Sequence, residues 1–436
     1  MLATQSNFKA YYGSIFKESW KTSKLFRILL IIAAVWAALR FTAQIVMMLD
    51  PVSGQLSVDL QVYLDAAKNF AQHANLYPTN LEILEYHFPY PPVYALLFVP
   101  FLWLPKQVTI FIHLILHILA YCAIFWRWGK IFQHWNLEKA SKTLILTLPV
   151  WFFFSAFWDD LIYLNIYTIM ALLGTLFIES TLKEDLRGAT LWLTLILITK
   201  PMWAFAAAIP LFIGNYRFFG KLIAYSLVSY LTLSIATLLI GGSSYVWGQY
   251  QDYVHLLTRL GQDFPWRGPE SGFLGYNHSI KQIFVFFLGP SSTILLIATL
   301  TKIILLVPVA ILAIKKVIRP LGEVQENITT ILELTLLLYL GAFIWLDIVW
   351  EATLSIAIFA YILSTVDRKA KVIISAIFLP YAILDFWRLA GYLAGLPMIH
   401  DAYLVSDYSM YIPTTMLVIV TMYIILAIKQ FPRRQA

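Results

Sequence analysis

Long apolar runs, separated by short polar stretches, follow one another along almost the whole chain. A helix that crosses a bilayer needs about 20 predominantly apolar residues. Since proline has no N–H donor, we expect one of the runs, 189–213, to break at Lys200-Pro201 into two half-helices. The pattern indicates an all-α polytopic membrane protein of about twelve spans. The predicted segments are 25–48, 106–126, 143–157, 162–178, 189–213, 221–240, 292–313, 329–345, 352–365, 371–388 and 411–428.

The basic residues predict how these spans are oriented, because lysine and arginine between spans favour the cytoplasmic side. Placing every basic cluster inside puts both termini in the cytoplasm. It also requires 91–126 to cross only once in net terms, so the short, Pro-rich part 91–105 dips into the membrane or lies in its interface. Full crossing of 91–105 would place the basic loop 127–142 outside. The loops that face outward are 49–90, 158–161, 241–279, 346–351 and 389–410.

Composition agrees with a protein of a cell (inner or plasma) membrane. Of the 436 residues, 60% are hydrophobic and 13% are charged, against about 25% charged residues in soluble domains. The net charge of +7 comes from the loop clusters, so it does not suggest nucleic acid. We expect a cytoplasmic segment 1–24, a single transmembrane unit 25–428 and a cytoplasmic tail 429–436.

Several kinds of active site have no counterpart in the sequence. The single cysteine, Cys122, allows neither an intramolecular disulfide nor a thiolate metal cluster. The chain contains no phosphate-binding Gly-rich loop with Lys-Ser/Thr, no His-Glu-x-x-His and no Gly-x-Ser-x-Gly. A cytoplasmic site that uses nucleotides is therefore not expected.

The first outward loop contains a candidate catalytic carboxylate. If 57–71 forms a helix, one face carries Asp59, Tyr63, Ala66, Ala67 and Phe70. We expect this juxtamembrane helix to lie on the membrane surface with Asp59 near its start, where a carboxylate can act as a general base. The alternative is that Asp59 only caps the helix, as Ser57 also can.

Polar residues from separate segments converge on the same outward face. They are Lys200, Asp347, Glu351, Arg388, Asp160 and Asn165. Such convergence is typical of a site, although single cations also snorkel to headgroups. Lys302 and Glu333 fall deeper or nearer the cytoplasm, and we expect structural roles for both.

The long outward loop adds a second group of polar residues. Asn277 and His278 offer donors and acceptors suited to a sugar or a phosphate, and Trp266-Arg267 adds an indole and a cation. Asn277 can equally cap a short helix over 279–288, and tryptophan is common at membrane interfaces. Both interpretations stay open from the residues alone.

The order of these motifs resembles that of the bacterial polyprenyl-phosphate-sugar glycosyltransferases of family 87, in the multispanning GT-C superfamily. Two positions depart from the family pattern and bear on substrate choice: Ala352-Thr353 replaces a common histidine, and Tyr163-Leu164 replaces Gly-Gln before Asn165. The resemblance is carried by Asp59-Leu60, Tyr63, Ala66, Leu76-Tyr77-Pro78, Phe88, Tyr90-Pro91-Pro92, Pro100, Leu104-Pro105, Asn165, Lys200-Pro201, Asn277-His278-Ser279-Ile280 and Trp350-Glu351.

The resemblance implies a GT-C-like bundle and an inverting α-mannosyltransferase-like activity. The donor would be a polyprenyl-phosphate sugar such as the mannose derivative, and the acceptor a hydroxyl of a glycolipid or glycan outside the cell. Asp59 would be the base. The candidate phosphate-binding cations, in order of preference, are Lys200, Arg267 and Arg388. The candidate sugar-binding residues are Tyr63, Tyr90, Asp160, Asn165, Trp266, Asn277, His278 and Glu351.

The same interpretation requires no metal and no cofactor, because cations alone can stabilise the leaving phosphate. Two rival functions stay open. A transporter or flippase for lipid-linked saccharides would share the broken helix and the intramembrane charges. A surface-polysaccharide polymerase or ligase would also keep its site on an outer loop, but the loop 241–279 has only Arg259 and Arg267 as arginines.

Overall fold

The structure is a computed structural model of the chain. Every regular element in its described part is a helix. The all-α fold expected from the apolar runs is therefore confirmed for these residues. The structure describes residues 8–49, 57–77, 88–212, 214–260, 264–271, 274, 277–318, 328–350, 355–383 and 414–430.

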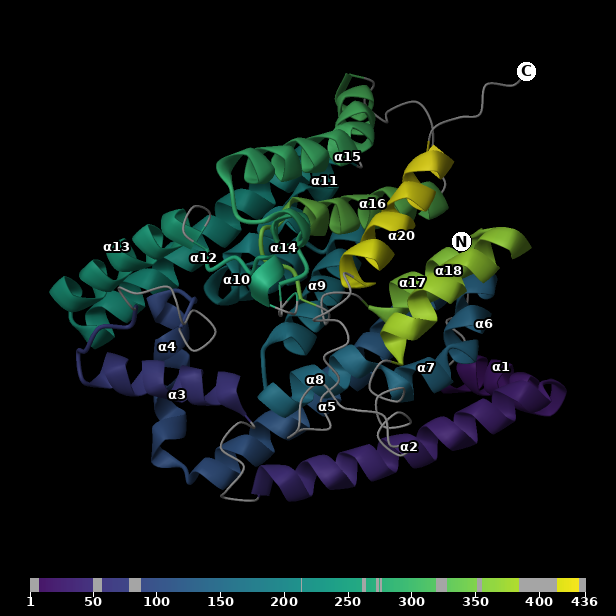
Figure 1. Ribbon diagram of the computed structural model, residues 1–436, viewed down its shortest axis with the longest axis horizontal. Coiled ribbons are helices and arrows are strands. Elements are labelled where there is room, and N and C mark those ends of the chain that lie inside the picture. Colours follow the sequence, from purple (N-terminus) through teal and green to yellow (C-terminus); the bar gives the residue numbers. More distant parts are fainter. Residues whose placement is uncertain are drawn as a thin grey trace.

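The helices follow one another with short connections and pack into one body (Figure 1). They are α1 (Phe8–Thr22), α2 (Lys24–Leu49), α3 (Val58–Ala71), α4 (Pro92–Phe98), η2 (Val99–Trp103), α5 (Lys106–His134), α6 (Glu138–Leu146), α7 (Leu148–Phe153), α8 (Ser155–Tyr163), α9 (Tyr167–Leu182), α10 (Leu186–Thr199), η3 (Pro201–Ala208), α11 (Ile209–Phe212), α12 (Tyr216–Gly241), α13 (Ser243–Leu260), η4 (Pro269–Ser271), α14 (Ile280–Leu288), α15 (Ser292–Ile318), α16 (Ile328–Trp345), α17 (Ile356–Thr365), α18 (Arg368–Ala382) and α20 (Thr414–Gln430).

In the described part of the chain, five helices are long and apolar enough to cross a membrane: α2, α5, α12, α15 and α16. The count is six if α6 and the following α7–α8, bent by 47°, form one broken span. Shorter apolar helices account for most of the other predicted segments. The structure therefore supports a protein with several spans, and the number of about twelve stays a prediction.

The centre of the molecule is formed by helices that are apolar on all sides. Helix α9 packs between α5 and α10, and α16 packs against α20. Thirteen of the 16 residues of α9 and eleven of the 18 residues of α16 are buried, as expected for helices without a polar face. By contrast α12 and α15 expose large side chains such as Leu239 and Ile304, which suits helices that face lipid.

Two predicted loops are helical in the structure. Helix α8 covers the predicted loop 158–161, and α13 occupies the first half of the predicted loop 241–279. In α13 the buried residues Val246, Tyr253 and Leu256 recur at helical spacing and face the core, while many of their neighbours are exposed. A segment with this amphipathic pattern is too polar for a transmembrane helix, and for that reason 241–279 was predicted to be a loop.

Other expectations about local structure are confirmed. The first-loop helix predicted over 57–71 is α3, the break at Lys200-Pro201 separates α10 from η3, and the short helix predicted over 279–288 is α14. The Pro-rich segment 91–105 forms α4 and η2. Pro92 occupies the first turn of α4, where a missing N–H donor is tolerated.

Candidate functional site

Asp59 lies in the first turn of α3, at a junction with the end of α8. The residue before this helix, Ser57, has a left-handed backbone (φ 61°), and its N–H donates to the carbonyl of Ile162 at 2.9 Å. Ser57 occupies the N-cap position, so the alternative that Asp59 is the cap is wrong. The Asp59 carboxylate is therefore available for other contacts.

Four polar side chains form a chain of hydrogen bonds that ends on Asp59. The Tyr63 hydroxyl donates to Asn165 Oδ1 at 3.2 Å. The Tyr63 and Tyr90 hydroxyls lie 3.0 Å apart, and since the Tyr63 proton is already used, Tyr90 is the donor of that bond. Asn165 Oδ1 also accepts from the N–H of Ile166. The amide group of Asn165 therefore donates to the Asp59 carboxylate.

Burial and nearby charges change the acidity of Asp59. Loss of contact with water raises the pKa of this carboxyl well above its usual range, and the negative charge of Asp160 raises it further. The Lys200 ammonium and the hydrogen bond from Asn165 lower the same pKa, but they do not cancel the effect of burial. The residue as a whole is nevertheless partly exposed. A raised pKa in such a carboxyl is a feature of general bases.

Lys200 brings a cation to the same place. It follows the last residue of α10, where Pro201 ends the helix. Its Nζ lies 3.6 Å from the centre of the Tyr167 ring and 5.3 Å from that of Tyr90, in cation–π contact. The side chain is 8% exposed. Among the residues that the structure describes, no carboxylate oxygen lies within 4.0 Å of Lys200.

Asp160 is the second carboxylate of this group. Asp160 Oδ2 accepts from the N–H of Thr168 at 2.8 Å, and Oδ1 is buried without a partner in the described structure. A turn brings Asp160 close to Asn165: Leu164 takes up a left-handed backbone (φ 51°), and the N–H of Asn165 donates to the Asp160 carbonyl. Leu164 is the C-cap residue of α8, and a left-handed residue is common where a helix ends.

The sequence interpretation did not include His117, which contacts both of these residues. His117 Nε2 contacts the Asn165 carbonyl and lies 3.9 Å from Asp160 Oδ2. Its Nδ1 donates to the carbonyl of His113 at 2.7 Å. A signal was present, because His113 and His117 sit one helical turn apart inside an otherwise apolar helix. Ionisable residues in such helices usually serve a site.

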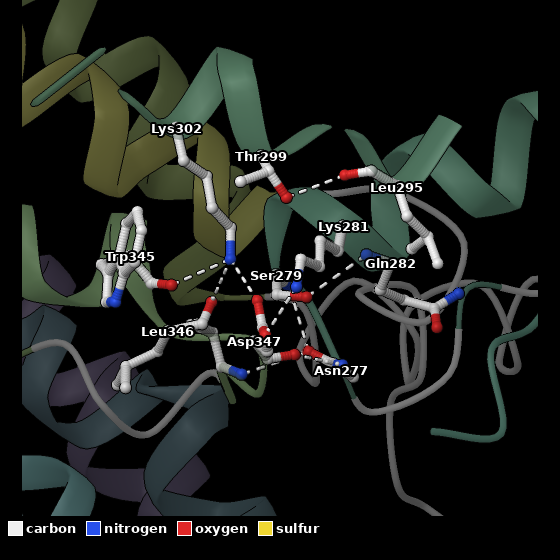
Figure 2. Close-up of polar contacts among 11 residues, drawn as sticks. Asn277, Ser279, Lys281, Gln282, Leu295, Thr299, Lys302, Trp345, Leu346 and Asp347 are labelled. Atoms are coloured by element: carbon white, nitrogen blue, oxygen red, sulfur yellow. Dashed lines mark hydrogen bonds and ion pairs between the residues drawn. The ribbon is translucent and has the colours of Figure 1, made fainter. Parts of the chain in front are cut away.

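Several other polar residues singled out in the sequence form a cluster around Asp347 (Figure 2). Lys302 donates to the carbonyls of Trp345 and Leu346 and to Asp347 Oδ1, and these three acceptors use all three N–H bonds of its ammonium. Lys281 pairs with Asp347 Oδ2 at 2.8 Å. These contacts agree with the structural role expected for Lys302.

Asn277 and His278 connect this cluster to the main site through the backbone. Asn277 donates to the Asp347 carbonyl at 2.8 Å and accepts from the N–H groups of Ser279 and Val349. The N–H of His278 donates to the Val349 carbonyl. The segment that is held in this way continues to Trp350, whose ring packs against Tyr167, 5.0 Å between centres.

The remaining predicted residues are farther from this group or outside the described residues. Arg267 and Gln282 of α14 exchange two hydrogen bonds through the Arg267 backbone, and the Trp266 ring packs at a tilt against Phe264. The contacts of Arg267 described here are to Gln282 and do not involve Asp59. Arg388 and Glu351 lie outside the described residues. Glu333, expected to be structural, pairs with Lys429 at 2.5 Å.

The Asp347 cluster gives a prediction about stability. Asp347→Asn leaves the Lys302 ammonium, 2% exposed, without a counter-charge. We expect a loss of about 3 kcal/mol, because the Lys302 ammonium is buried and loses its counter-charge, although the Asp347 side chain is itself 32% exposed. The thermal midpoint of the purified protein measures this effect. The double variant Lys302→Met with Asp347→Asn should recover much of the loss, and Lys281→Met should cost less than about 1 kcal/mol. Equal midpoints for the single and double variants would contradict the assignment.

The arrangement is suited to group transfer. It combines a carboxylate that can take up a proton with a cation and with a second carboxylate, Asp160, one oxygen of which has no partner among the described residues. In the described part of the chain, no three His, Cys, Asp or Glu residues lie close enough together to hold a metal ion. That the reaction needs no metal stays a prediction.

Comparisons with known proteins show which family the chain belongs to. Over 178 residues the chain is 26% identical to an alpha-(1->3)-arabinofuranosyltransferase of Mycolicibacterium smegmatis (strain ATCC 700084 / mc(2)155), an alignment that covers 40% of each protein. No solved structure matches the chain. The family description for glycosyltransferase family 87 matches residues 88–346, which is more than half of the 436 residues. The chain therefore belongs to glycosyltransferase family 87.

Proposed function

We propose that this membrane glycosyltransferase moves a sugar from a polyprenyl-phosphate donor to a hydroxyl of a glycolipid or glycan, on the extracytoplasmic face of a GT-C-like bundle. The observation that carries the proposal is the pairing of a carboxylate, Asp59, with a buried ammonium, Lys200, which influence each other without being in contact. A reacting centre placed between them would have a proton acceptor on one side and a cation for the departing phosphate on the other.

The proposed reaction is a single displacement. Asp59 takes the proton of the acceptor hydroxyl as its oxygen bonds to the anomeric carbon of the sugar. The bond from that carbon to the phosphate oxygen breaks on the opposite face, and polyprenyl phosphate leaves with the electron pair. Lys200 stabilises the negative charge that develops on the phosphate. Attack opposite to the leaving group inverts the anomeric configuration.

The other members of the group would hold the sugar. Asp160 Oδ1 is buried and lacks a partner in the described structure, and such an acceptor favours a ligand that brings a hydroxyl donor. Tyr63, Tyr90 and Asn165 would position Asp59 through their hydrogen bonds. The roles proposed for Trp266, Asn277 and His278 are weaker, since both polar ends of the Asn277 side chain already bind the backbone.

The donor sugar is the part of the proposal that needs a direct comparison. We propose mannose first, and an arabinofuranose second because of the name of the M. smegmatis relative. Purified protein should transfer label from one of the two polyprenyl-phosphate sugars to a panel of lipid acceptors. Transfer from neither donor, in a preparation that is monodisperse and folded, would refute the function. Transport of a lipid-linked sugar into sealed vesicles without any transfer would favour the flippase alternative.

The raised pKa of Asp59 predicts the pH dependence of transfer. A general base works only when it is ionised, so kcat/KM should fall as the pH drops through the pKa of Asp59. Because burial raises this pKa, the fall should begin at a higher pH than for an ordinary aspartate, with its pKa of about 3.9. The donor is a phosphodiester and does not titrate in this range. A flat profile from about pH 5 to 8 would argue against Asp59 as the base.

A further inference from the structure

His117 of α5 lies beside the candidate site, and both of its ring nitrogens face oxygen acceptors. Nδ1 contacts the carbonyl of His113 at 2.7 Å, and Nε2 contacts the carbonyl of Asn165. Asp160 Oδ2 lies 3.9 Å from the same Nε2. A backbone carbonyl can only accept a hydrogen bond, and so can an ionised carboxylate. Both ring nitrogens of His117 therefore have surroundings that suit a donor.

The neutral imidazole ring does not fit these surroundings. It has one N–H group and one nitrogen with a lone pair, so one of the two carbonyl oxygens would face that lone pair. The side chains of His117 and Asp160 are both 1% exposed, and a buried polar group without a partner is costly. The imidazolium form of the ring donates from both nitrogens and carries a positive charge.

A buried imidazolium needs a negative charge nearby, and Asp160 supplies it. Asp160 Oδ2 also accepts from the N–H of Thr168, in the first turn of α9, where the helix dipole favours an anion. On α5 itself the neighbouring ionisable group is His113, whose ring stacks on the apolar ring of Phe98. Asp160 is therefore the counter-charge that the described structure offers to His117.

The pairing of His117 with Asp160 bears on Lys200. The Lys200 ammonium lies within electrostatic range of both Asp59 and Asp160. It contacts the ring of Tyr167, 3.6 Å from the ring centre, at the same end of α9 that binds Asp160. Without a positive charge on His117, Lys200 would be the cation left to compensate Asp160.

We infer that His117 is a positioning residue held as an imidazolium, which neutralises Asp160 and so keeps the Lys200 ammonium available to the phosphate of the donor. The charge of His117 follows from its own contacts, whereas the effect on the phosphate rests on the proposed function. The competing interpretation is a histidine that only joins α5 to the turn after α8. Such a histidine needs an N–H donor at Nε2 but no charge.

Nitrogen NMR of the ring tests the charge directly and needs no variant. Leu116-His117 is the only Leu-His pair in the sequence, so ¹³C-carbonyl leucine combined with ¹⁵N-histidine identifies the signals of His117. The full-length protein is measured in phosphatidylcholine nanodiscs at neutral pH. We expect both ring nitrogens of His117 to be protonated. A ring with one unprotonated nitrogen would overturn the inference.

A replacement without charge tests the effect on Lys200. His117→Gln keeps an N–H donor for the Asn165 carbonyl but cannot become positive. We expect kcat for transfer to fall about tenfold or more, the scale of one lost interaction with a charged group. In an Asp160→Asn background, where no carboxylate has to be neutralised, the same change should cost less than about twofold. The matched control is His134→Gln at the exposed last residue of α5, which should retain full activity.

The outcomes separate this inference from the proposed function. Full activity of His117→Gln, or an equal loss with and without the Asp160 carboxylate, would overturn the role of His117 towards Lys200. A protonated His117 ring in a folded protein that transfers no sugar would refute the proposed function alone. Sugar transfer by a protein with a neutral His117 ring would refute this inference alone.

Discussion

Asp59→Asn is expected to lower kcat about 10²–10⁴-fold, the range that a positioned general base contributes. The amide has nearly the shape of the carboxylate but cannot take the proton of the acceptor hydroxyl. Binding of the donor should change little, because the phosphate is assigned to Lys200. Single-turnover transfer with purified protein measures the loss, and an unchanged rate would exclude Asp59 as the base.

Stability and a neighbouring carboxylate provide the controls for this variant. Since burial raises the pKa of Asp59, ionised Asp59 opposes folding at a pH above that pKa. The neutral amide should therefore not lower the thermal midpoint. Asp65→Asn changes an exposed carboxylate on the same helix, where Asp65 accepts a hydrogen bond from Gln61 at 2.9 Å. It should retain full activity, and a comparable loss in this control would point to a general effect on α3.

Lys200→Met should have the second largest effect, a loss of about 10²–10³ in kcat, as when one preorganised donor to a developing charge is removed. The long apolar chain of methionine keeps the packing against Tyr167. Lys200→Arg retains the charge and should restore part of the rate. Lys68→Met, at an exposed position on α3, is the control. If Lys200→Met changed only KM, the ammonium would bind the donor without stabilising the transition state.

The double variant tests whether the two groups act on the same step. Asp59 and Lys200 sit on opposite sides of the proposed reacting centre, and each influences the charge of the other. We expect the combined loss of Asp59→Asn and Lys200→Met to be smaller than the product of the single losses, because residues that act as a unit are not additive. If the loss in the double variant equalled the product of the single losses, Asp59 and Lys200 would act in separate steps.

The parts of the site that could be predicted from sequence are those with a local signal. Asp59 and Tyr63 share one face of a helix, and Lys200 is followed by a helix-breaking proline. The structure brings these residues together with Asp160 and Asn165, although the sequence could not supply the distances. The pairing of His117 with Asp160 joins helices far apart in the chain, and no local pattern encodes such a contact.

The motif around Asn277 shows what the residue type alone cannot predict. Its donors and acceptors suggested a sugar ligand, but its side chain binds the Asp347 carbonyl and the Val349 N–H. The side-chain amide of asparagine can form hydrogen bonds equally well with a sugar and with the backbone, so the residue type alone does not distinguish the two partners. The helix α13 was missed for a related reason, because a half-polar helix and a loop have similar composition.

The hydrogen bonds of Lys302 to the end of α16 bear on the depth in the membrane at which the reaction takes place. Helix α16 ends at Trp345, and the last carbonyl groups of a helix have no partner within it. Where such an end lies in an apolar layer, each unsatisfied carbonyl group is costly. The Lys302 ammonium caps those of Trp345 and Leu346. The chain that leads to Trp350 can thus begin below the headgroups, and we expect the sugar to be transferred in a recess of the bilayer that its lipid carrier need not leave.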